Sequence, residues 1–265
     1  MHRRTLAAAL AALSLSAIIP AAHAAATLKV GATAGPHAAI VAAAARVAEA
    51  SGLKVKVIEF TDYLSPNRAL EEGALDVVVY QHEPFLNNFN RQQGTHLAKI
   101  GNAVVQPMGL YSNRIRKLAS IPVGARIAIP NDPTNSGRAL LLLQNAGLIK
   151  LRDGVDGNKA LVVDIRKNPK NLRIVELEAA QLPRSLDDVD IAAIPMNYVI
   201  SAGLSPKKQG FFFEDLKAPF ALMIIASREN NRNDRNVQAF VRAYQSEPVR
   251  AFILKTFDGA VNPAW

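Results

Sequence analysis

Short apolar runs alternate with helix-forming segments along almost the whole chain, and this alternation constrains the fold more than any other feature. It is typical of α/β proteins, in which strands form parallel sheets with helices on both faces. The expected strands are Leu28–Ala32, Leu53–Phe60, Val77–Tyr80, Val104–Tyr111, Arg126–Pro130, Leu172–Leu177, Ile191–Ile194, Phe211–Phe213 and Phe220–Ala226. The expected helices are Pro36–Ala50, Pro66–Glu72, Pro84–Gln93, Ala139–Gln144, Asn197–Gly203, Asp234–Gln245 and Pro248–Phe257.

The unit from Arg126 to Gly147 carries the clearest functional signal. A buried strand, Arg126–Pro130, leads into loop residues and then a helix, which Gly147 would end in the C′ position. The residues able to cap the start of this helix are Thr134, Asn135 and Ser136. Unpaired backbone N–H groups at a helix start attract anions, so the amides of residues 134–137 are expected to bind a ligand carboxylate.

Arg138 is expected in the first turn of that helix, where its charge opposes the helix dipole. One interpretation is a bidentate clamp for a ligand carboxylate or phosphate. The other is a solvated surface arginine. This segment alone does not decide between them.

Ligands in open α/β sheets bind beyond the carboxyl ends of the strands, so the loops after the strands are the expected site. These loops are rich in aromatic, amide and histidine side chains; they are residues 33–37, 61–63, 81–85, 131–138 and 195–198. None places a nucleophile beside a base, and no P-loop or other catalytic motif is present. The loops therefore favour binding, and an exported enzyme on the same fold is the less favoured alternative.

Composition excludes several other classes. The 265 residues are 49% hydrophobic and 20% charged, which is ordinary for a globular protein. With no cysteine, disulfides, thiolate metal sites and cysteine nucleophiles are excluded. The net charge is +9, but the basic residues are scattered without an aromatic platform, so no nucleic-acid partner is expected.

The N-terminus has the pattern of a secretory signal peptide. A basic start is followed by the apolar run Leu6–Ile19 and by Ala22-His23-Ala24, which predicts cleavage after residue 24. No cysteine follows that could carry lipid. The expected location is therefore the periplasm, in soluble form after cleavage, and a surface-adhesion role is disfavoured.

Four segments resemble the NlpA/MetQ family, the methionine-binding proteins of bacterial ABC importers. They are Phe60–Tyr63, Gln81–Leu86, Ile129–Leu143 and Asn168–Asp188, and the resemblance runs from about Leu28 to Trp265. It implies a two-lobed, type II periplasmic-binding fold with doubly wound sheets that closes on its ligand about a hinge. It also implies a small-molecule ligand, delivered to a membrane permease with a cytoplasmic ATPase.

The resemblance assigns the site residues. Arg138 matches the family arginine that binds the ligand α-carboxylate, and Tyr63, His82 and Phe85 match positions lining the side-chain pocket. Tyr80 stands where the family usually has phenylalanine. His82 could instead only cap the following helix and pack in the core. Sulfur–aromatic contacts in such a pocket suit methionine.

Two positions depart from the family pattern. Pro195 and Leu222 stand where the family has asparagines that hold the amino and carboxylate groups of the ligand, while Asn197 lies two residues beyond the first. Asn197 or backbone carbonyls are the remaining candidates for binding the ligand ammonium. A different small carboxylate or a short peptide therefore stays open as an alternative ligand to methionine.

The implied organisation is a first lobe of residues 25–108 with 219–265, and a second lobe of 109–218. Extended crossovers near Val104–Tyr111 and Pro219–Ala226 would form the hinge. No cofactor is expected, nor a metal site from His37, His82 and His96, and His37 is expected to be a residue of the helix start. The expected assembly is a monomer.

Overall fold

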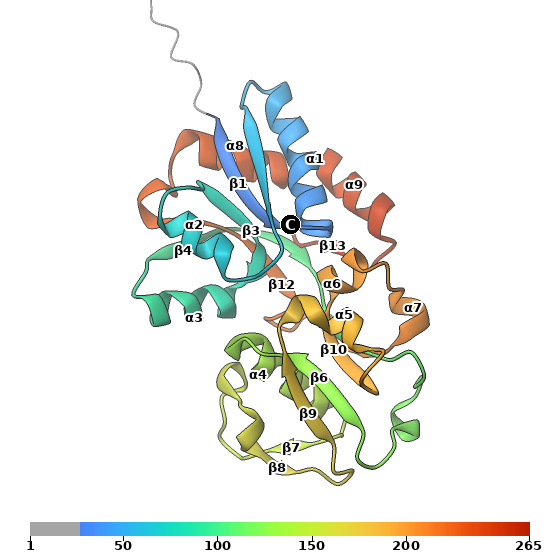
Figure 1. Cartoon of the computed structure of the whole chain (residues 1–265). Helices are drawn as coiled ribbons and strands as arrows, with labels where there is room; N and C mark the ends of the chain where they lie inside the picture. The colour runs from blue at the N-terminus through green and yellow to red at the C-terminus, as the bar shows by residue number, and fades with distance from the viewer. Residues whose placement is uncertain (1–26) are drawn as a thin grey trace, which may run out of the picture.

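Two β-sheets built from different parts of the chain organise the computed structural model, which describes residues 27–265 (Figure 1). The signal-peptide prediction concerns residues 1–24 and therefore lies outside the described residues. Each sheet carries helices on both faces and forms one lobe, so the expected two-lobed α/β class is confirmed.

The first sheet has six strands and mixed direction. In spatial order they are β13 (Asn262–Pro263), β4 (Leu97–Val105), β12 (Leu222–Arg228), β3 (Val77–His82), β1 (Leu28–Thr33) and β2 (Val55–Phe60). The β1 strand is parallel to β2 and β3, whereas β12 is antiparallel to both β3 and β4. The expectation of purely parallel sheets was wrong, because β12 returns from the second lobe and enters the sheet from its opposite end.

Helices cover both faces of this sheet. Packed on one face are α1 (Pro36–Ala50), α8 (Arg235–Tyr244) and α9 (Glu247–Phe257), and on the other α2 (Ser65–Glu71) and α3 (Glu83–Gln93). In α1, Pro36 occupies the first turn, where its missing N–H costs nothing, and small alanines let the helix pack closely on the strands.

The second sheet has five strands. They are β11 (Gly210–Phe213), β5 (Met108–Tyr111), β10 (Ile191–Pro195), β6 (Arg126–Pro130) and β9 (Arg173–Leu177). On one face lies α4 (Pro133–Asn145), and on the other α5 (Leu182–Ser185) and α6 (Met196–Ser201). Successive residues of β6 point to opposite faces of the sheet. Ile127 and Ile129 therefore pack against α4, while Ala128 packs into the core on the other face.

Smaller elements complete the second lobe. A two-stranded sheet pairs β7 (Lys150–Leu151) with β8 (Ile165–Lys167), and α7 (Pro206–Gln209) precedes β11. Sequence patterns did not predict these three elements or β13.

The chain passes between the two sheets at two places. The expected single run Val104–Tyr111 is divided, because β4 ends at Val105 in the first sheet and β5 begins at Met108 in the second. Residues 106–107 therefore form the first crossover, and residues 214–221 form the second.

Candidate functional site

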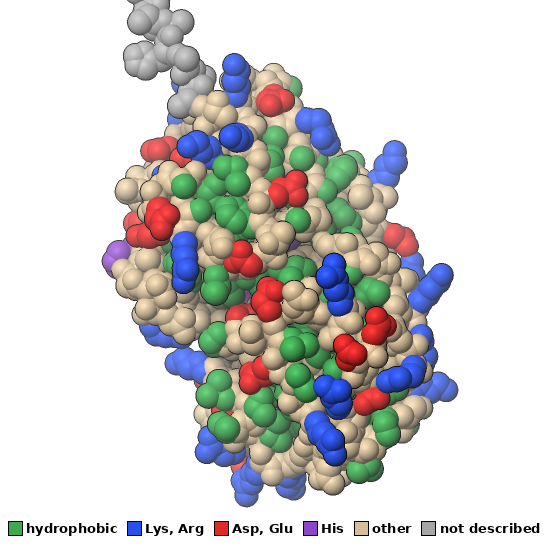
Figure 2. Space-filling view, in the orientation of Figure 1, with side chains coloured by type: hydrophobic (Ala, Val, Ile, Leu, Met, Phe, Trp, Pro, Cys, Tyr) green, Lys and Arg blue, Asp and Glu red, His purple; other side chains and the backbone are tan. Residues whose placement is uncertain are grey.

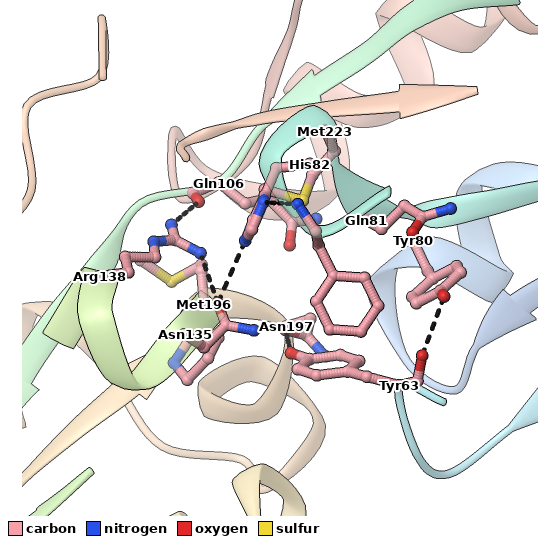
Figure 3. A pocket seen from close by; sticks show the side chains of 12 residues that line it. Tyr63, Tyr80, Gln81, His82, Gln106, Asn135, Arg138, Met196, Asn197 and Met223 are labelled. Atoms are coloured by element: carbon pink, nitrogen blue, oxygen red, sulfur yellow. Dashed lines mark hydrogen bonds between the residues drawn. The ribbon is translucent and has the colours of Figure 1, made fainter. Parts of the chain in front are cut away.

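One pocket lies between the lobes, with about 320 Å³ of space free of protein atoms along its lining, open solvent included. Its lining residues are Tyr63, Tyr80, Gln81, His82, Phe85, Gln106, Asn135, Arg138, Pro195, Met196, Asn197 and Met223. All six residues predicted to bind the ligand are among them, and Figure 3 shows that they reach the pocket from different elements.

An aromatic wall forms the part of the pocket belonging to the first lobe. The Tyr63 ring centroid lies 6.1 Å from that of Tyr80 and 6.2 Å from that of Phe85. The Tyr80 hydroxyl donates to the Tyr63 carbonyl oxygen at 2.9 Å. Burial raises the pKa of both tyrosine hydroxyls well above the usual value, so both remain protonated donors.

His82 has both of the roles that the sequence allowed, as a helix cap and as a residue of the pocket. It is the N-cap of α3, where its Nδ1 accepts the Phe85 backbone N–H at 3.1 Å, and it also lines the pocket. Because Nδ1 is an acceptor, the proton of the neutral ring lies on Nε2, which donates to Asn135 Oδ1 at 3.2 Å across the lobes. Burial, together with the charge of Arg138, lowers the pKa of His82 to about 3.

Arg138 is buried and lies in the second turn of α4, not in the first, because the helix begins at Pro133. Its Nη2 contacts Glu214 Oε2 at 2.6 Å, and its Nε donates to the same carboxylate at 3.1 and 3.2 Å. Nη2 also donates to the Gln106 carbonyl oxygen at 3.1 Å. The bidentate contact that was expected with a ligand is thus made with Glu214. Of the three guanidinium nitrogens, Nη1 has the weakest contact within the chain, at 3.4 Å from Asn135 Oδ1.

The start of α4 differs from the expectation. Its cap is Asp132, whose Oδ1 accepts the Asn135 backbone N–H at 2.9 Å, and not Thr134, Asn135 or Ser136. Burial raises the pKa of the Asp132 carboxyl. The chain's own carboxylate therefore occupies the place at which the sequence predicted an anionic ligand.

Asn197 lies on α6, directly after the end of β10. Its Oδ1 accepts the Tyr63 hydroxyl at 2.7 Å, a contact between the lobes, while its buried Nδ2 has no partner among the described residues. Pro195 lines the same pocket. The second position that departs from the family pattern is Leu222. The pocket there is lined by the next residue, Met223.

Several residues in or beside the pocket were not predicted to bind the ligand. Gln81, Asn135 and Met196 lie in segments that the strand-end rule selected, but no pattern there marked them as pocket-lining residues. Gln106 and Glu214 lie in the crossovers between the sheets, where no sequence pattern pointed to a site.

Other kinds of site were also considered. Among residues 27–265 no group of three or more His, Cys, Asp or Glu side chains is arranged to hold a metal ion. His37, the second residue of α1 as expected, is buried away from the pocket, and burial lowers its pKa to about 4. Within the same range no helix combines the length and the apolarity of a membrane span.

Two α/β lobes with a pocket between them are the architecture of periplasmic substrate-binding proteins. Residues 28–265 match the model of the NlpA lipoprotein family, and the chain belongs to that family. It is 45% identical to the D-methionine-binding lipoprotein MetQ of Yersinia pestis, over 90% of this chain and 88% of the relative. It is 46% identical to the probable D-methionine-binding lipoprotein MetQ of Vibrio cholerae, over the same shares of the two chains.

Solved structures agree with this assignment. A nutrient-binding protein of Burkholderia cenocepacia, bound to methionine, is 45% identical with a TM-score of 0.87, covering 90% of this chain and all of that one (100%). An ABC-transporter periplasmic substrate-binding protein of Coxiella burnetii is 43% identical with a TM-score of 0.85, at the same coverage.

These relatives correct the expected localisation. The family model and the MetQ relatives are named lipoproteins, which are lipid-anchored and membrane-associated, whereas the sequence had predicted a soluble protein without lipid. That prediction depended on the absence of a cysteine after residue 24, and the sequence contains no cysteine. A periplasmic location agrees with the comparisons.

Proposed function

We propose that this chain is the substrate-binding component of an ABC importer and that it binds methionine in the pocket between its lobes. The observation that carries this proposal is the presence of two kinds of surface in one pocket. Phe85, Met196 and Met223 offer aromatic and thioether surface. Arg138 and the side-chain amides of Gln106 and Asn197 offer hydrogen-bond donors. A ligand with an apolar thioether side chain and a carboxylate matches both kinds of surface.

The relatives support this ligand over the alternatives. The Burkholderia cenocepacia structure holds methionine, and the named relatives bind D-methionine. The family asparagines are absent at Pro195 and Leu222, and in this proposal the unpartnered Nδ2 of Asn197 supplies a donor to the ligand carboxylate in their place.

Within this function we assign Arg138 and Asn197 to the polar end of the ligand. Tyr63, Tyr80, His82 and Phe85 would surround its side chain. The lobes would comprise residues 25–106 with 219–265, and residues 107–218, with the hinge at the two crossovers. The first boundary is moved from the expected 108 because Met108 pairs with Pro195 in the second sheet.

The partner implied by this function is an ABC permease with its cytoplasmic ATPase, and the chain would act as a monomeric carrier without enzymatic activity. Lys and Arg side chains are interspersed with acidic ones on the face that Figure 2 shows, as they are along the sequence. That distribution favours a carrier of small molecules over a nucleic-acid-binding protein.

Calorimetric titration with L- and D-methionine tests the proposal. We expect saturable binding of methionine with one ligand per chain, and native mass spectrometry of the purified protein should show the mass of any retained ligand. Absence of binding by either enantiomer, combined with retention of a peptide or of another carboxylate, would favour the alternative ligand class.

A further inference from the structure

Two glutamines line the pocket, but their amide groups differ in one respect. Gln81 is committed to Asn67: its Nε2 donates to Asn67 Oδ1 at 2.7 Å, and its Oε1 accepts the Asn67 amide at 2.8 Å. The Gln106 Nε2 is buried and has no partner among the described residues. Buried donors are almost always paired, so this exception points to a group that the chain itself does not supply.

The backbone of Gln106 is fixed on both sides. Its N–H donates to the Ala221 carbonyl oxygen at 2.7 Å, which ties together the two crossovers between the lobes. Its carbonyl oxygen accepts from Arg138 Nη2 at 3.1 Å. The side chain of Gln106 therefore starts from a defined position beside the guanidinium and extends into the pocket (Figure 3).

Three donors consequently meet in one pocket. They are the Gln106 Nε2, the unpartnered Asn197 Nδ2 and the Arg138 Nη1, the guanidinium nitrogen that Glu214 leaves free. No Asp or Glu belongs to the described lining residues, and Glu214 contacts the guanidinium only at Nε and Nη2, away from the Nη1 donor. Their chemical complement is an anionic group with several acceptor lone pairs, which is a carboxylate.

We propose that Gln106 is a ligand-binding residue whose side-chain amide donates to the ligand carboxylate and discriminates carboxylates from neutral groups. This inference rests on the proposed function and assigns a residue of that same site. The position of Gln106 in the crossover also gives the contact a second consequence. A ligand carboxylate bound there touches the hinge segment itself and links occupancy of the pocket to the closed arrangement of the lobes.

Calorimetry with three ligands and two variants tests this role. The ligands are methionine, methioninol, which lacks the carboxylate, and 2-hydroxy-4-(methylthio)butanoate, which lacks the ammonium. Gln106→Met keeps the length of the side chain and removes the donor, so methionine should bind about 10- to 100-fold more weakly, as for a lost hydrogen bond to a charged group. Gln106→Glu places a like charge beside the ligand carboxylate and should weaken binding further.

The ratios between ligands separate a binding role from a structural one. In Gln106→Met the preference for methionine over methioninol should shrink by the same factor, while the preference for methionine over the hydroxy acid stays unchanged. Equal weakening of all three ligands, or a change in the hydroxy-acid ratio alone, would overturn the assignment. Gln92→Glu, the same substitution at an exposed residue of α3, serves as the matched control for added charge.

The two proposals fail in different ways. A wild-type protein that binds no methionine contradicts the proposed function and, with it, the role of Gln106. Tight wild-type binding with unchanged ligand ratios in both variants contradicts only the role of Gln106. Thermal melts without ligand verify that each variant is folded. If Gln106→Met does not fold, Gln106→Glu is compared with methionine and methioninol alone, and its preference for methionine should shrink at least as much.

Discussion

Arg138 is held from behind by Glu214, and this contact determines what the guanidinium can offer a ligand. Both side chains are buried, with 3% and 9% of their surfaces exposed, so neither charge is solvated well by water. Nε and Nη2 face Glu214, which leaves Nη1 toward the pocket. The pair is neutral as a whole, so a zwitterionic ligand enters a site without excess charge.

Replacement of Arg138 by alanine should weaken methionine binding by roughly 30- to several-thousand-fold. A buried carboxylate that loses its charged partner costs about 2–5 kcal/mol, and each 1.4 kcal/mol is about tenfold in affinity. Calorimetry on the wild type and the variant measures the change. Because Glu214 is then buried without a partner, the melting temperature of the ligand-free variant should also fall.

The double variant Arg138→Ala/Glu214→Ala separates these two effects. Removal of Glu214 eliminates the unpaired buried charge, so the melting temperature should recover in part while the affinity does not. Recovery of affinity in the double variant would contradict binding of the ligand carboxylate by Arg138.

His37 predicts a pH dependence of folding stability. Burial lowers its pKa from 6.5 to about 4 in the folded state. As pH falls below 6.5, the unfolded chain takes up a proton that the folded chain does not, so the free energy of unfolding decreases until about pH 4 and then levels off. At about pH 5.5 this single group should cost roughly 1.4 kcal/mol relative to about pH 7.5.

Urea unfolding at both pH values, compared with His37→Gln, isolates this contribution. The glutamine cannot titrate, so the variant should lose about 1.4 kcal/mol less stability between the two pH values than the wild type. The neutral Nδ1 of His37 has no partner in the described structure, so the variant removes no bond of that atom. An identical pH dependence in both proteins would show that folding does not lower the pKa of His37.

At the scale of single elements, the end of α4 provides a further test. Gly147 follows the C-cap Ala146 and has φ of 72°, a left-handed conformation that costs other residues energy. Gly147→Ala should therefore lower the free energy of unfolding by about 1 kcal/mol. Gly147→Asn is the control and should cost less, because asparagine tolerates this conformation. Chemical denaturation of the three proteins decides between these outcomes.

Local chemistry explains which elements could be predicted. The α1 helix begins at Pro36 and ends before a glycine turn, and its observed bounds are those expected. The strand β6 and the position of Gly147 were likewise predicted from neighbouring residues. The cap of α4 was not, because Asp132 competes with three other capping residues and only the fold decides among them.

Residues whose role depends on the meeting of distant segments could not be predicted. The run from Val104 to Tyr111 is mostly apolar, and Gln106 and Pro107 within it do not by themselves show that the chain changes sheets there. Glu214 pairs with a residue 76 positions away. The six predicted site residues lie in one pocket because loops at strand ends, and the resemblance to a family, carry information about tertiary contacts that periodicity lacks.

At the scale of the whole molecule, direct contacts join the lobes around the pocket. The Tyr63 hydroxyl donates to Asn197 at 2.7 Å, His82 contacts Asn135 at 3.2 Å, and the Tyr198 hydroxyl donates to the Thr61 carbonyl at 3.0 Å. All three cross between the lobes, so the structure corresponds to a closed arrangement. Opening would expose these groups to water, which can replace each bond, so the closed state without ligand has little energetic advantage.

Methionine should therefore reduce the radius of gyration measured by small-angle X-ray scattering. The ligand adds contacts to both lobes at once, from Arg138 and Asn197 on one side and from the aromatic wall on the other, and it can favour the closed state only through this differential affinity. Arg138→Ala, measured at the same methionine concentration, should keep the larger radius, because it loses most of the ligand's contact with the second lobe. Identical scattering curves for the wild type with and without saturating methionine would contradict closure, and equal compaction of the variant would show that Arg138 does not contribute to it.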